Sequence, residues 1–373
     1  MYIVNYACTT AAGPDVGSLL DALSQGRDTS QPMWAGGRAC FIDGQIEKTE
    51  SHEEIFNRWL KILWSKMNVD FGNDRVALVF ASTKGYIEDY VWHSDEQEIR
   101  KHDDPYSKTS QSFCDSHPEV SWSVVCNISN ACCSSHVAFE YVQDLFSQNR
   151  ADSAVVIGAD LVGPFIYKGF NALKVISPTT NRPFSADREG LQLGEAVTMI
   201  AFSAKPKAGG DLEILNVASD TEGSSITRPS INGAGLVRAI QKMQDATPLN
   251  PDLVIAHGTG TKFNDFAEDM ALRRFLGNLD LLNVPVTNTK WSIGHTLGAS
   301  GSVDLIAACE ILKTQKVFCI ANTNNKDPEF QMNYLTTENS VSPPSKIGQI
   351  LITSLGFGGV HAALAVGLRK DPA

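Results

Sequence analysis

Residues 124–142 read VVCNISNACCSSHVAFEYV: an apolar run, a turn of small residues, and a segment with apolar residues at helical spacing. A strand, a tight turn and a helix in this order form the repeating unit of α/β folds. Two adjacent cysteines, Cys132 and Cys133, lie in the turn. A helix N-terminus lowers the pKa of a thiol, which is about 8.5 in free cysteine, and so favours a nucleophile here. Position alone does not choose between the two.

The same alternation of strands and helices runs through the first half of the chain. Buried strands are predicted at YIVNYACT, DRVALVFAST, SAVVIGAD and EAVTMIAFSA, and a helix at VGSLLDALSQGR. The stretch 92–120 is polar and aperiodic, which predicts a long excursion over the surface. The alternation predicts α/β layers around a central sheet.

The second half of the sequence repeats this pattern. Strands are predicted at LEILNVASD, DLVIAHGTGT and VPVTNTK, and helices at GAGLVRAIQKMQ and GASGSVDLIAACEILKTQ. We therefore predict one duplicated architecture, with an N-terminal half over residues 1–205 and a C-terminal half over 206–373. No long linker separates the halves, so we expect them to pack together with a site at the join.

Composition and charge limit the classes of function. The formal net charge of −11 argues against nucleic-acid binding, because a phosphate backbone requires a basic face. No apolar run reaches the roughly 20 residues that cross a bilayer. The start, MYIVNYACTTAAG, lacks the pattern of a signal peptide. We therefore expect a cytoplasmic protein without membrane insertion.

The eight cysteines lack the dense spacing of a disulfide framework, so most are expected to be small buried side chains. A metal site at Cys126, Cys132 and Cys133 is an alternative on ligand type alone. Their spacing matches none of the usual zinc patterns, and we expect no metal.

Two histidines stand out among the eight in the sequence. His257 ends the predicted strand in VIAHGTGT, and His295 lies in the glycine-rich loop of KWSIGHTLGASG, just before a helix. Loops in such places commonly carry chemistry. Together with a cysteine at a helix start, they form a set suited to nucleophilic and acid/base catalysis.

Four motifs in this order, NACCSS, HGTGTKFNDFAE, NTKWSIGHTLGASG and SLGFGGVHA, resemble those of a known family. They are similar to the active-site motifs of the beta-ketoacyl-ACP synthases, the elongating condensing enzymes (synthase I and II type) of the thiolase superfamily. The resemblance covers nearly the whole chain. It implies a thiolase-like α/β fold, in which two duplicated βα halves pack as a five-layered α-β-α-β-α sandwich.

The resemblance also assigns the catalytic residues. The family's nucleophile follows Ala in its turn, which implies Cys132 and leaves Cys133 as a packing residue. His257 and His295 would donate hydrogen bonds to the oxyanion that develops on the malonyl thioester. Lys290 matches the family's lysine and Glu268 its acidic partner, and this pair would orient the histidines.

Further residues are assigned to the substrate. The backbone amides of Cys132 and Phe357 would form the oxyanion hole for the acyl carbonyl, with the Phe357 ring as a gate to the acyl pocket. Thr259 and Thr261 resemble residues that bind the pantetheine arm, although such threonines can also simply cap a turn. Gly358 and Gly359 are expected beside the substrate, because glycines let backbone N–H groups approach a ligand.

The implied reaction transfers an acyl chain from acyl carrier protein to Cys132 and condenses it with malonyl carrier protein, in fatty acid or in polyene or polyketide biosynthesis. No separate cofactor is expected, because 4'-phosphopantetheine arrives on the carrier protein. We expect a homodimer, or a heterodimer with a second ketosynthase-like subunit. An acidic carrier would need a local basic patch. Two candidates for that patch are Arg58, Lys61 and Lys66 in one segment and Lys174 and Arg182 in another.

Two departures and three rivals remain. Val360 and His361 replace the usual Thr-Asn, and the first half is short for the family, so the acyl substrate is left open. A thiolase or an initiating synthase shares the fold. However, the former uses a late second cysteine and the latter an Asn in place of the second histidine. A chain-length-factor-like subunit that mainly shapes a partner's pocket is the third alternative, but such subunits typically lack the nucleophile.

Overall fold

The computed structural model describes residues 1–33, 37–44, 50–93, 106–207, 211–339, 344 and 346–369. The first half forms β1 (Tyr2–Thr10), α1 (Val16–Ser24), β2 (Gln31–Pro32), β3 (Arg38–Cys40), η1 (Ile42–Gly44), α2 (His52–Met67), β4 (Val76–Ala81), α3 (Ile87–His93), α5 (Ser107–Asp115), β5 (Trp122–Ile128), α6 (Ser134–Ser147), β6 (Ser153–Asp160), α7 (Pro164–Ala172), β7 (Leu193–Gly194) and β8 (Ala196–Ser203).

The second half follows β8 in the chain. It forms β9 (Leu212–Thr221), α8 (Ala234–Ala246), β10 (Leu253–Ile255), α9 (Lys262–Gly277), β11 (Pro285–Thr287), α10 (Lys290–Ile293), η2 (Leu297–Ala299), α11 (Ser300–Thr314), β12 (Asn333–Tyr334), β13 (Gln349–Leu355), η3 (Phe357–Gly359) and β14 (Val360–Leu368).

The two halves share one strand order. Eleven of the described strands form a sheet in the order β12-β11-β10-β13-β14-β9-β1-β8-β6-β4-β5. When the five principal strands of each half are numbered along the chain, both halves have the order 3-2-4-5-1 (β5-β4-β6-β8-β1 and β11-β10-β13-β14-β9). In this sheet order, the first three strands of each half pair in parallel. The fourth strand pairs antiparallel with the third, and the fifth pairs antiparallel with the fourth. The predicted duplication is therefore confirmed, whereas its boundary at residue 205 stays a prediction.

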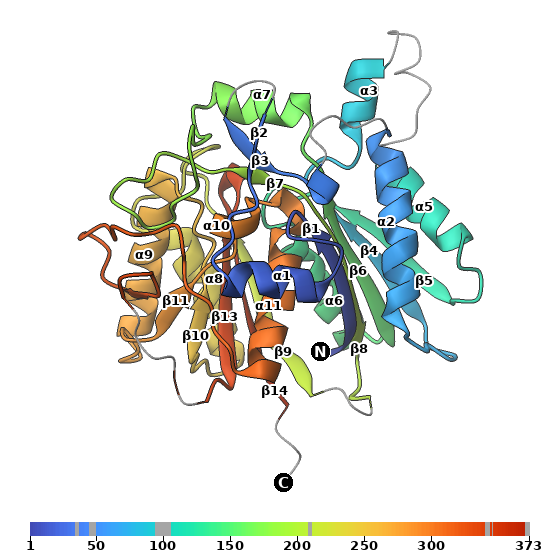
Figure 1. Cartoon of the computed structure of the whole chain (residues 1–373). Coiled ribbons are helices and arrows are strands. Elements are labelled where there is room, and N and C mark those ends of the chain that lie inside the picture. Colours follow the sequence, from blue (N-terminus) through green and yellow to red (C-terminus); the bar gives the residue numbers. More distant parts are fainter. Residues whose placement is uncertain are drawn as a thin grey trace.

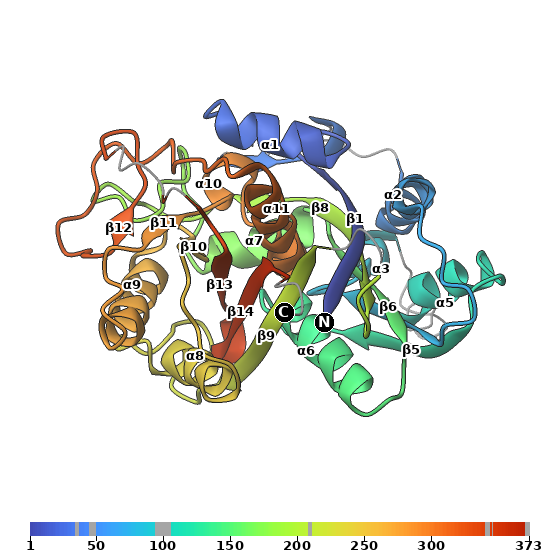
Figure 2. The same cartoon turned by 90° about the horizontal axis from the view of Figure 1, so that it is seen from below.

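One helix layer is shared between the two half-sheets. Helices α6 and α11 contact each other, and each touches strands of both halves. Helices α2 and α5 cover the outer face of the first half-sheet, while α8 packs on β9 and β14 and against α9 at the opposite side (Figures 1 and 2). The predicted five-layered sandwich is confirmed. The half-sheets are continuous, because β1 pairs with β9 at Tyr2↔Glu213 and Ile3↔Leu212.

Burial explains the sequence of the central strands. All residues of β4, β6 and β8 are buried, because helices cover both faces of this half-sheet. Helix α6 is amphipathic instead and turns Ala138, Phe139, Val142 and Leu145 into the core.

Two parts differ from the sequence prediction or add to it. The excursion predicted over 92–120 falls partly outside the described residues, but it contains helix α5, whose Phe113 and Cys114 are buried. The strands β2, β3 and β7 form a small separate sheet. Side chains of this sheet and of α7 share an apolar cluster with Phe357, so this element covers the site described next.

Candidate active site

The turn between β5 and α6 holds Cys132 in a constrained conformation. Ala131 has φ +47°, in the left-handed region that non-glycine residues rarely adopt. The Ser134 hydroxyl donates to the Ala131 carbonyl at 2.7 Å and accepts from the Asn130 amide at 2.8 Å. These bonds close the turn and place Cys132 just before the N-terminus of α6.

The two adjacent thiols face different surroundings. Cys132 lines a pocket that it shares with both histidines, and its Sγ lies 2.9 Å from His295 Nε2. Cys133 is fully buried, with its Sγ 3.4 Å from Ser354 Oγ and 3.3 Å from the Val360 carbonyl. Only Cys132 is therefore open to a ligand, and Cys133 packs as predicted.

Burial disfavours charge on both members of the Cys132–His295 pair. It raises the pKa of the Cys132 thiol to about 12, an effect that the Phe357 backbone N–H and the charge of Lys290 oppose only in part. It also lowers the pKa of His295 to about 3, with a further contribution from Lys290. The other ring nitrogen, His295 Nδ1, lies 3.0 Å from Ser300 Oγ. When Nδ1 carries the hydrogen and donates to Ser300, Nε2 is free to accept the thiol proton.

His257 lies beside this pair, at the end of β10. Its ring centroid is 5.2 Å from that of His295, and the ring planes are nearly perpendicular at 89°. Burial, followed by the charge of Lys290, holds the pKa of His257 well below its usual value. Both histidines line the pocket with Cys132, so a substrate carbonyl there meets two neutral imidazoles.

The predicted pairing of Lys290 with Glu268 is wrong. Lys290 Nζ donates instead to Asp304 Oδ2 at 2.9 Å, and both side chains are almost fully buried. Asp304 lies one turn into α11, which starts directly after the His295 loop and turns this carboxylate back toward Lys290.

Glu268 instead binds the loop that carries His257. Its carboxylate accepts from the backbone amides of His257 at 2.7 Å and Gly258 at 2.8 Å, and from the Thr353 hydroxyl. Burial raises the pKa of Glu268, opposed by these hydrogen bonds. Glu268 therefore fixes the backbone of His257, whereas Asp304 fixes Lys290.

The pocket has a volume of about 490 Å³. Besides Cys132 and the two histidines, it is lined by Phe170, Leu173, Lys174, Val175, Glu189, Gly190, Leu191, Thr227, Arg228, Pro229, Thr259, Thr261, Lys262, Phe263, Asn264, Leu355, Gly356 and Phe357. The Phe357 ring stacks on Phe170, with centroids 5.4 Å apart.

Of the remaining predicted residues, the two threonines line the pocket wall and the two glycines lie in the turn after Phe357. Thr259 and Thr261 line the pocket with their hydroxyl oxygens 3.0 Å apart, and the Thr261 side chain does not cap its helix. Gly358 and Gly359 are not among the lining residues. Their φ values of +82° and +76° instead let the chain turn behind Phe357.

Three acidic or hydroxyl side chains of the site were not predicted from the sequence. These are Ser300, Asp304 and Asp265, whose carboxylate accepts from the amides of Thr259 at 3.0 Å and Gly260 at 3.1 Å. Burial raises the pKa of Asp265 to about 7. The sequence could have indicated Asp265, because it lies three residues before Glu268 on one helix and residues i and i+3 share a helix face.

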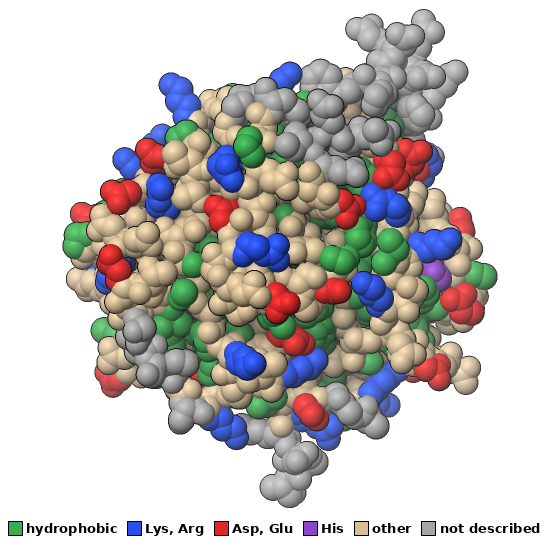
Figure 3. Space-filling view, in the orientation of Figure 1, with side chains coloured by type: hydrophobic (Ala, Val, Ile, Leu, Met, Phe, Trp, Pro, Cys, Tyr) green, Lys and Arg blue, Asp and Glu red, His purple; other side chains and the backbone are tan. Residues whose placement is uncertain are grey.

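The two predicted basic patches have different positions. Lys174 lines the pocket, together with Arg228 and Lys262, which lie outside both predicted patches. Arg58 instead forms ion pairs with Glu50 and Asp43. On the face shown in Figure 3, Lys and Arg are scattered among Asp and Glu.

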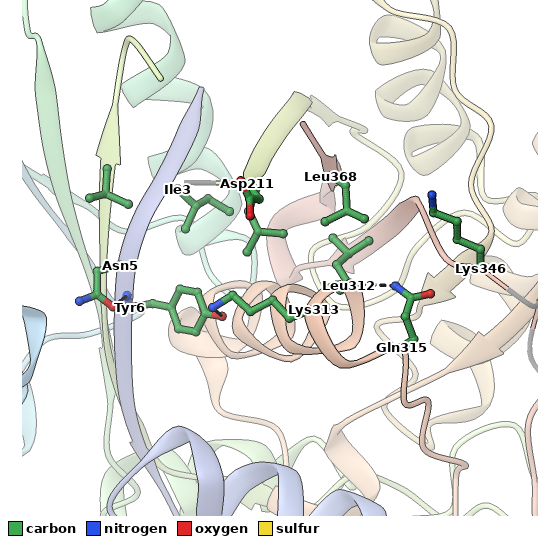
Figure 4. Close-up of a pocket in the computed structure, with 11 residues that line it drawn as sticks. Ile3, Asn5, Tyr6, Asp211, Leu312, Lys313, Gln315, Lys346 and Leu368 are labelled. Atoms are coloured by element: carbon green, nitrogen blue, oxygen red, sulfur yellow. Dashed lines mark hydrogen bonds between the residues drawn. The ribbon is translucent and has the colours of Figure 1, made fainter. Parts of the chain in front are cut away.

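A second hollow of about 620 Å³ lies where β1 meets β9 (Figure 4). Its lining includes no cysteine or histidine. Lys313 Nζ there contacts the Tyr6 hydroxyl at 2.6 Å. The thiol of Cys132 and the imidazoles of His257 and His295 therefore place the candidate active site in the pocket of about 490 Å³.

Within the described ranges, no group of three or more His, Cys, Asp or Glu side chains could hold a metal ion. Within the same ranges, every helix is too short or too polar to span a membrane. The cytoplasmic location stays a prediction.

Comparison with family models matches both halves of the chain. Residues 123–208 match the beta-ketoacyl synthase N-terminal domain, and residues 212–324 match the beta-ketoacyl synthase C-terminal domain. Together these regions make up more than half of the 373 residues.

Curated proteins and solved structures agree with these matches. Nodulation protein E of Rhizobium sp. (strain N33) is 30% identical over 250 residues, which are 65% of this chain and 61% of that protein. The tetracenomycin polyketide synthase ketoacyl synthase alpha subunit of Streptomyces glaucescens is 30% identical over 273 residues, 68% of this chain and 63% of that protein. The matches thus span about three fifths of these relatives. A ketosynthase solved in complex with its chain length factor, from Xenorhabdus doucetiae, has the same fold, with a TM-score of 0.78, 22% identity and coverage of 99% of this chain and 98% of that chain.

Proposed function

The chain belongs to the beta-ketoacyl synthase family, and on that premise we propose that it is a decarboxylating condensing enzyme that carries an acyl chain on Cys132. The observation that supports this most directly is the 2.9 Å contact between Cys132 Sγ and His295 Nε2, in a pocket shared with His257 and Phe357. The proposed substrates are acyl and malonyl thioesters of acyl carrier protein, with 4'-phosphopantetheine supplied by that carrier.

In the first half-reaction, Cys132 Sγ attacks the acyl thioester carbon while its proton passes to His295 Nε2. The backbone amides of Cys132 and Phe357 stabilise the tetrahedral oxyanion. The C–S bond to the carrier then breaks, and the proton on Nε2 goes to the departing pantetheine sulfur. This leaves an acyl thioester on Cys132 and a neutral His295.

In the second half-reaction, the malonyl carboxylate leaves as carbon dioxide, and its bonding electrons form an enolate. Hydrogen bonds from His257 and His295 stabilise the enolate oxygen. For this His295 must carry its hydrogen on Nε2, and the Ser300 hydroxyl allows this because it can donate to Nδ1 as well as accept from it. The enolate carbon then attacks the acyl carbon, the C–S bond to Cys132 breaks, and the thiolate takes up one proton from water, which restores the neutral thiol.

The carrier protein is proposed to dock at the pocket mouth. Lys174, Arg228 and Lys262 line the pocket there and offer a local positive charge to an acidic partner, despite the net charge of −11. The identity of the acyl chain, and hence fatty acid or polyene or polyketide biosynthesis, is not part of this proposal.

The proposed assembly is a dimer, with a second copy or with another ketosynthase-like subunit. Among the described strands, β5 forms an edge of the sheet and pairs only with β4. Such an edge offers unpaired backbone groups to a partner. The alternative of a mainly pocket-shaping subunit is disfavoured, because Cys132, His257 and His295 are all present and close together.

We would test this function by exposing the protein to a panel of carrier proteins loaded with different acyl chains and measuring its intact mass. We expect one acyl group per chain, mapped to a Cys132 peptide. It should be absent from Cys132→Ser and retained in the matched control Cys133→Ser. An acyl group on Cys133, or none with any carrier, would refute the nucleophile assignment.

A further inference from the structure

The loop between β9 and α8, residues 222–233, forms one wall of the pocket. Thr227, Arg228 and Pro229 line the pocket from this loop, whereas its Ile226 and Ile231 side chains are largely exposed, at 79% and 63%. A loop with so little apolar burial needs polar anchors to keep one conformation.

The carboxylate of Glu222 supplies these anchors. It accepts from the Ser230 amide at 2.5 Å, the Ser230 hydroxyl at 2.6 Å, the Ser224 hydroxyl at 3.2 Å and the Gly235 amide at 3.2 Å. Glu222 therefore ties the start of the loop to its end and to the first turn of α8. Burial alone would raise its pKa, but the hydrogen bonds of Ser230 and the charge of His361 lower it to about 2.

The same carboxylate reaches the turn that carries the Phe357 amide. His361 Nε2 lies 3.2 Å from Glu222 Oε1, a close polar contact without the alignment of a hydrogen bond. Burial lowers the pKa of His361, and the Glu222 carboxylate opposes this effect only in part. His361 follows that turn directly, as the second residue of β14. Its ring is held tightly, since a Cβ added at Gly235 would lie only 2.2 Å from His361 Cδ2.

Backbone hydrogen bonds complete the connection between loop and turn. The Glu222 amide donates to the Gly359 carbonyl at 2.8 Å, and the Gly358 amide donates to the Ile226 carbonyl at 2.7 Å. Phe357 precedes these glycines, and its own N–H acts on the Cys132 thiol.

We propose that Glu222 and His361 form a clasp that positions the Phe357 amide over Cys132 and fixes the Thr227–Pro229 wall. The pair would act through the turn and not by touching the substrate, so both are positioning residues. This inference rests on the proposed function, in which that amide stabilises the acyl oxyanion. It gives a role to His361, one of the two residues at which the chain departs from the motif that it resembles.

Two reactions of Cys132 separate positioning from general stability. Acyl transfer from the N-acetylcysteamine thioester of octanoic acid needs the oxyanion hole, whereas alkylation by iodoacetamide is a direct displacement that does not. Both are followed by intact mass on wild type and on His361→Ala, His361→Asn and Glu222→Gln. The matched control is Lys242→Gln, because Lys242 is half-exposed on helix α8 and pairs with Asp220 of β9.

For His361→Ala and Glu222→Gln we expect acyl transfer at least about tenfold slower, since displacing a catalytic group by about 1 Å can cost about 10²-fold. Alkylation should slow less than acyl transfer does, because displacement needs no oxyanion donor and loses only the effect of the Phe357 N–H on the thiol pKa. His361→Asn keeps a donor and should recover part of the rate, and Lys242→Gln should match wild type. Hydrogen exchange should show faster exchange at the Ser230 and Gly358 amides in His361→Ala.

The outcomes distinguish this inference from the function on which it rests. Variants that match wild type in acyl transfer, or that lose acyl transfer and alkylation to the same degree, overturn the clasp alone. A wild type that is alkylated at Cys132 but acylated neither by the octanoyl thioester nor by any member of the acyl carrier protein panel overturns the proposed function first, and the clasp with it.

Discussion

Lys290 and Asp304 are joined by a 2.9 Å ion pair in which both side chains are almost completely buried. The Thr289 hydroxyl also donates to this carboxylate, at 2.5 Å. The positive charge of Lys290 lowers the pKa of His257 and of His295, in each case after the larger effect of burial. The pair therefore links the stability of the fold to the protonation of the site.

Replacing Asp304 with Ala should destabilise the protein by about 3–5 kcal/mol, because Lys290 would stay buried without its partner. Denaturant unfolding measures the change. The control is Lys108→Ala, which breaks an exposed ion pair with Glu53 and should cost less than about 1 kcal/mol. An equal loss of unfolding free energy in the two variants would contradict the larger contribution to stability expected of the Lys290–Asp304 pair.

Alkylation of Cys132 by iodoacetamide should become faster with pH from 7 to 10 without reaching a plateau. The reason is that burial raises the thiol pKa to about 12, so the reactive thiolate fraction increases about tenfold per pH unit over this range. A free thiol with a pKa of about 8.5 would level off within the range. A plateau near pH 7 would show a thiolate–imidazolium pair with His295 instead.

His257→Ala should separate the two half-reactions. Acylation of Cys132 should continue, because His295 is the imidazole in contact with the thiol. Decarboxylation of the malonyl thioester should fall by about 10²–10³, the usual cost of one oxyanion donor. Intact mass reports the first step and release of labelled carbon dioxide the second. Loss of acylation would place His257 in the first step.

Gly359→Ala should impair both folding and acyl transfer. A Cβ at this position would lie 2.1 Å from the Glu222 carbonyl oxygen, in a residue with φ +76°. Gly358→Ala is the matched control, since its φ is +82° but nothing lies within 4 Å of the added Cβ. The control should lose only about 1–2 kcal/mol for the backbone conformation. We expect a clearly larger loss for Gly359→Ala in thermal unfolding, and equal losses would exclude a steric role.

The sequence predicted those features that depend on local pattern. The strand, turn and helix around Cys132, the duplicated halves and the placement of His257 and His295 follow from apolar periodicity and from motifs with a fixed order. The choice of Cys132 over Cys133 came from the motif that it resembles, and the contact with His295 agrees with it.

Contacts between distant segments could not be predicted in the same way. Asp304 and Glu268 are both acids on helices near Lys290 in sequence, and only the direction of each helix axis decides which carboxylate reaches the lysine. The contact of Glu222 with His361 joins residues 139 positions apart, across neighbouring strands β9 and β14. The small β2-β3-β7 sheet was missed because its strands have only two or three residues, too few for a periodic signal.

Helices α6 and α11 meet in the shared central layer, where Ser302 Oγ donates to Ser135 Oγ at 3.0 Å. One helix follows the nucleophile and the other follows the imidazole beside it, so neither repeat of the duplication holds a working set of groups by itself. A small displacement of one repeat relative to the other would separate Cys132 from His295 while leaving each repeat folded. Catalytic turnover should therefore report the alignment of the repeats more sensitively than thermal unfolding does.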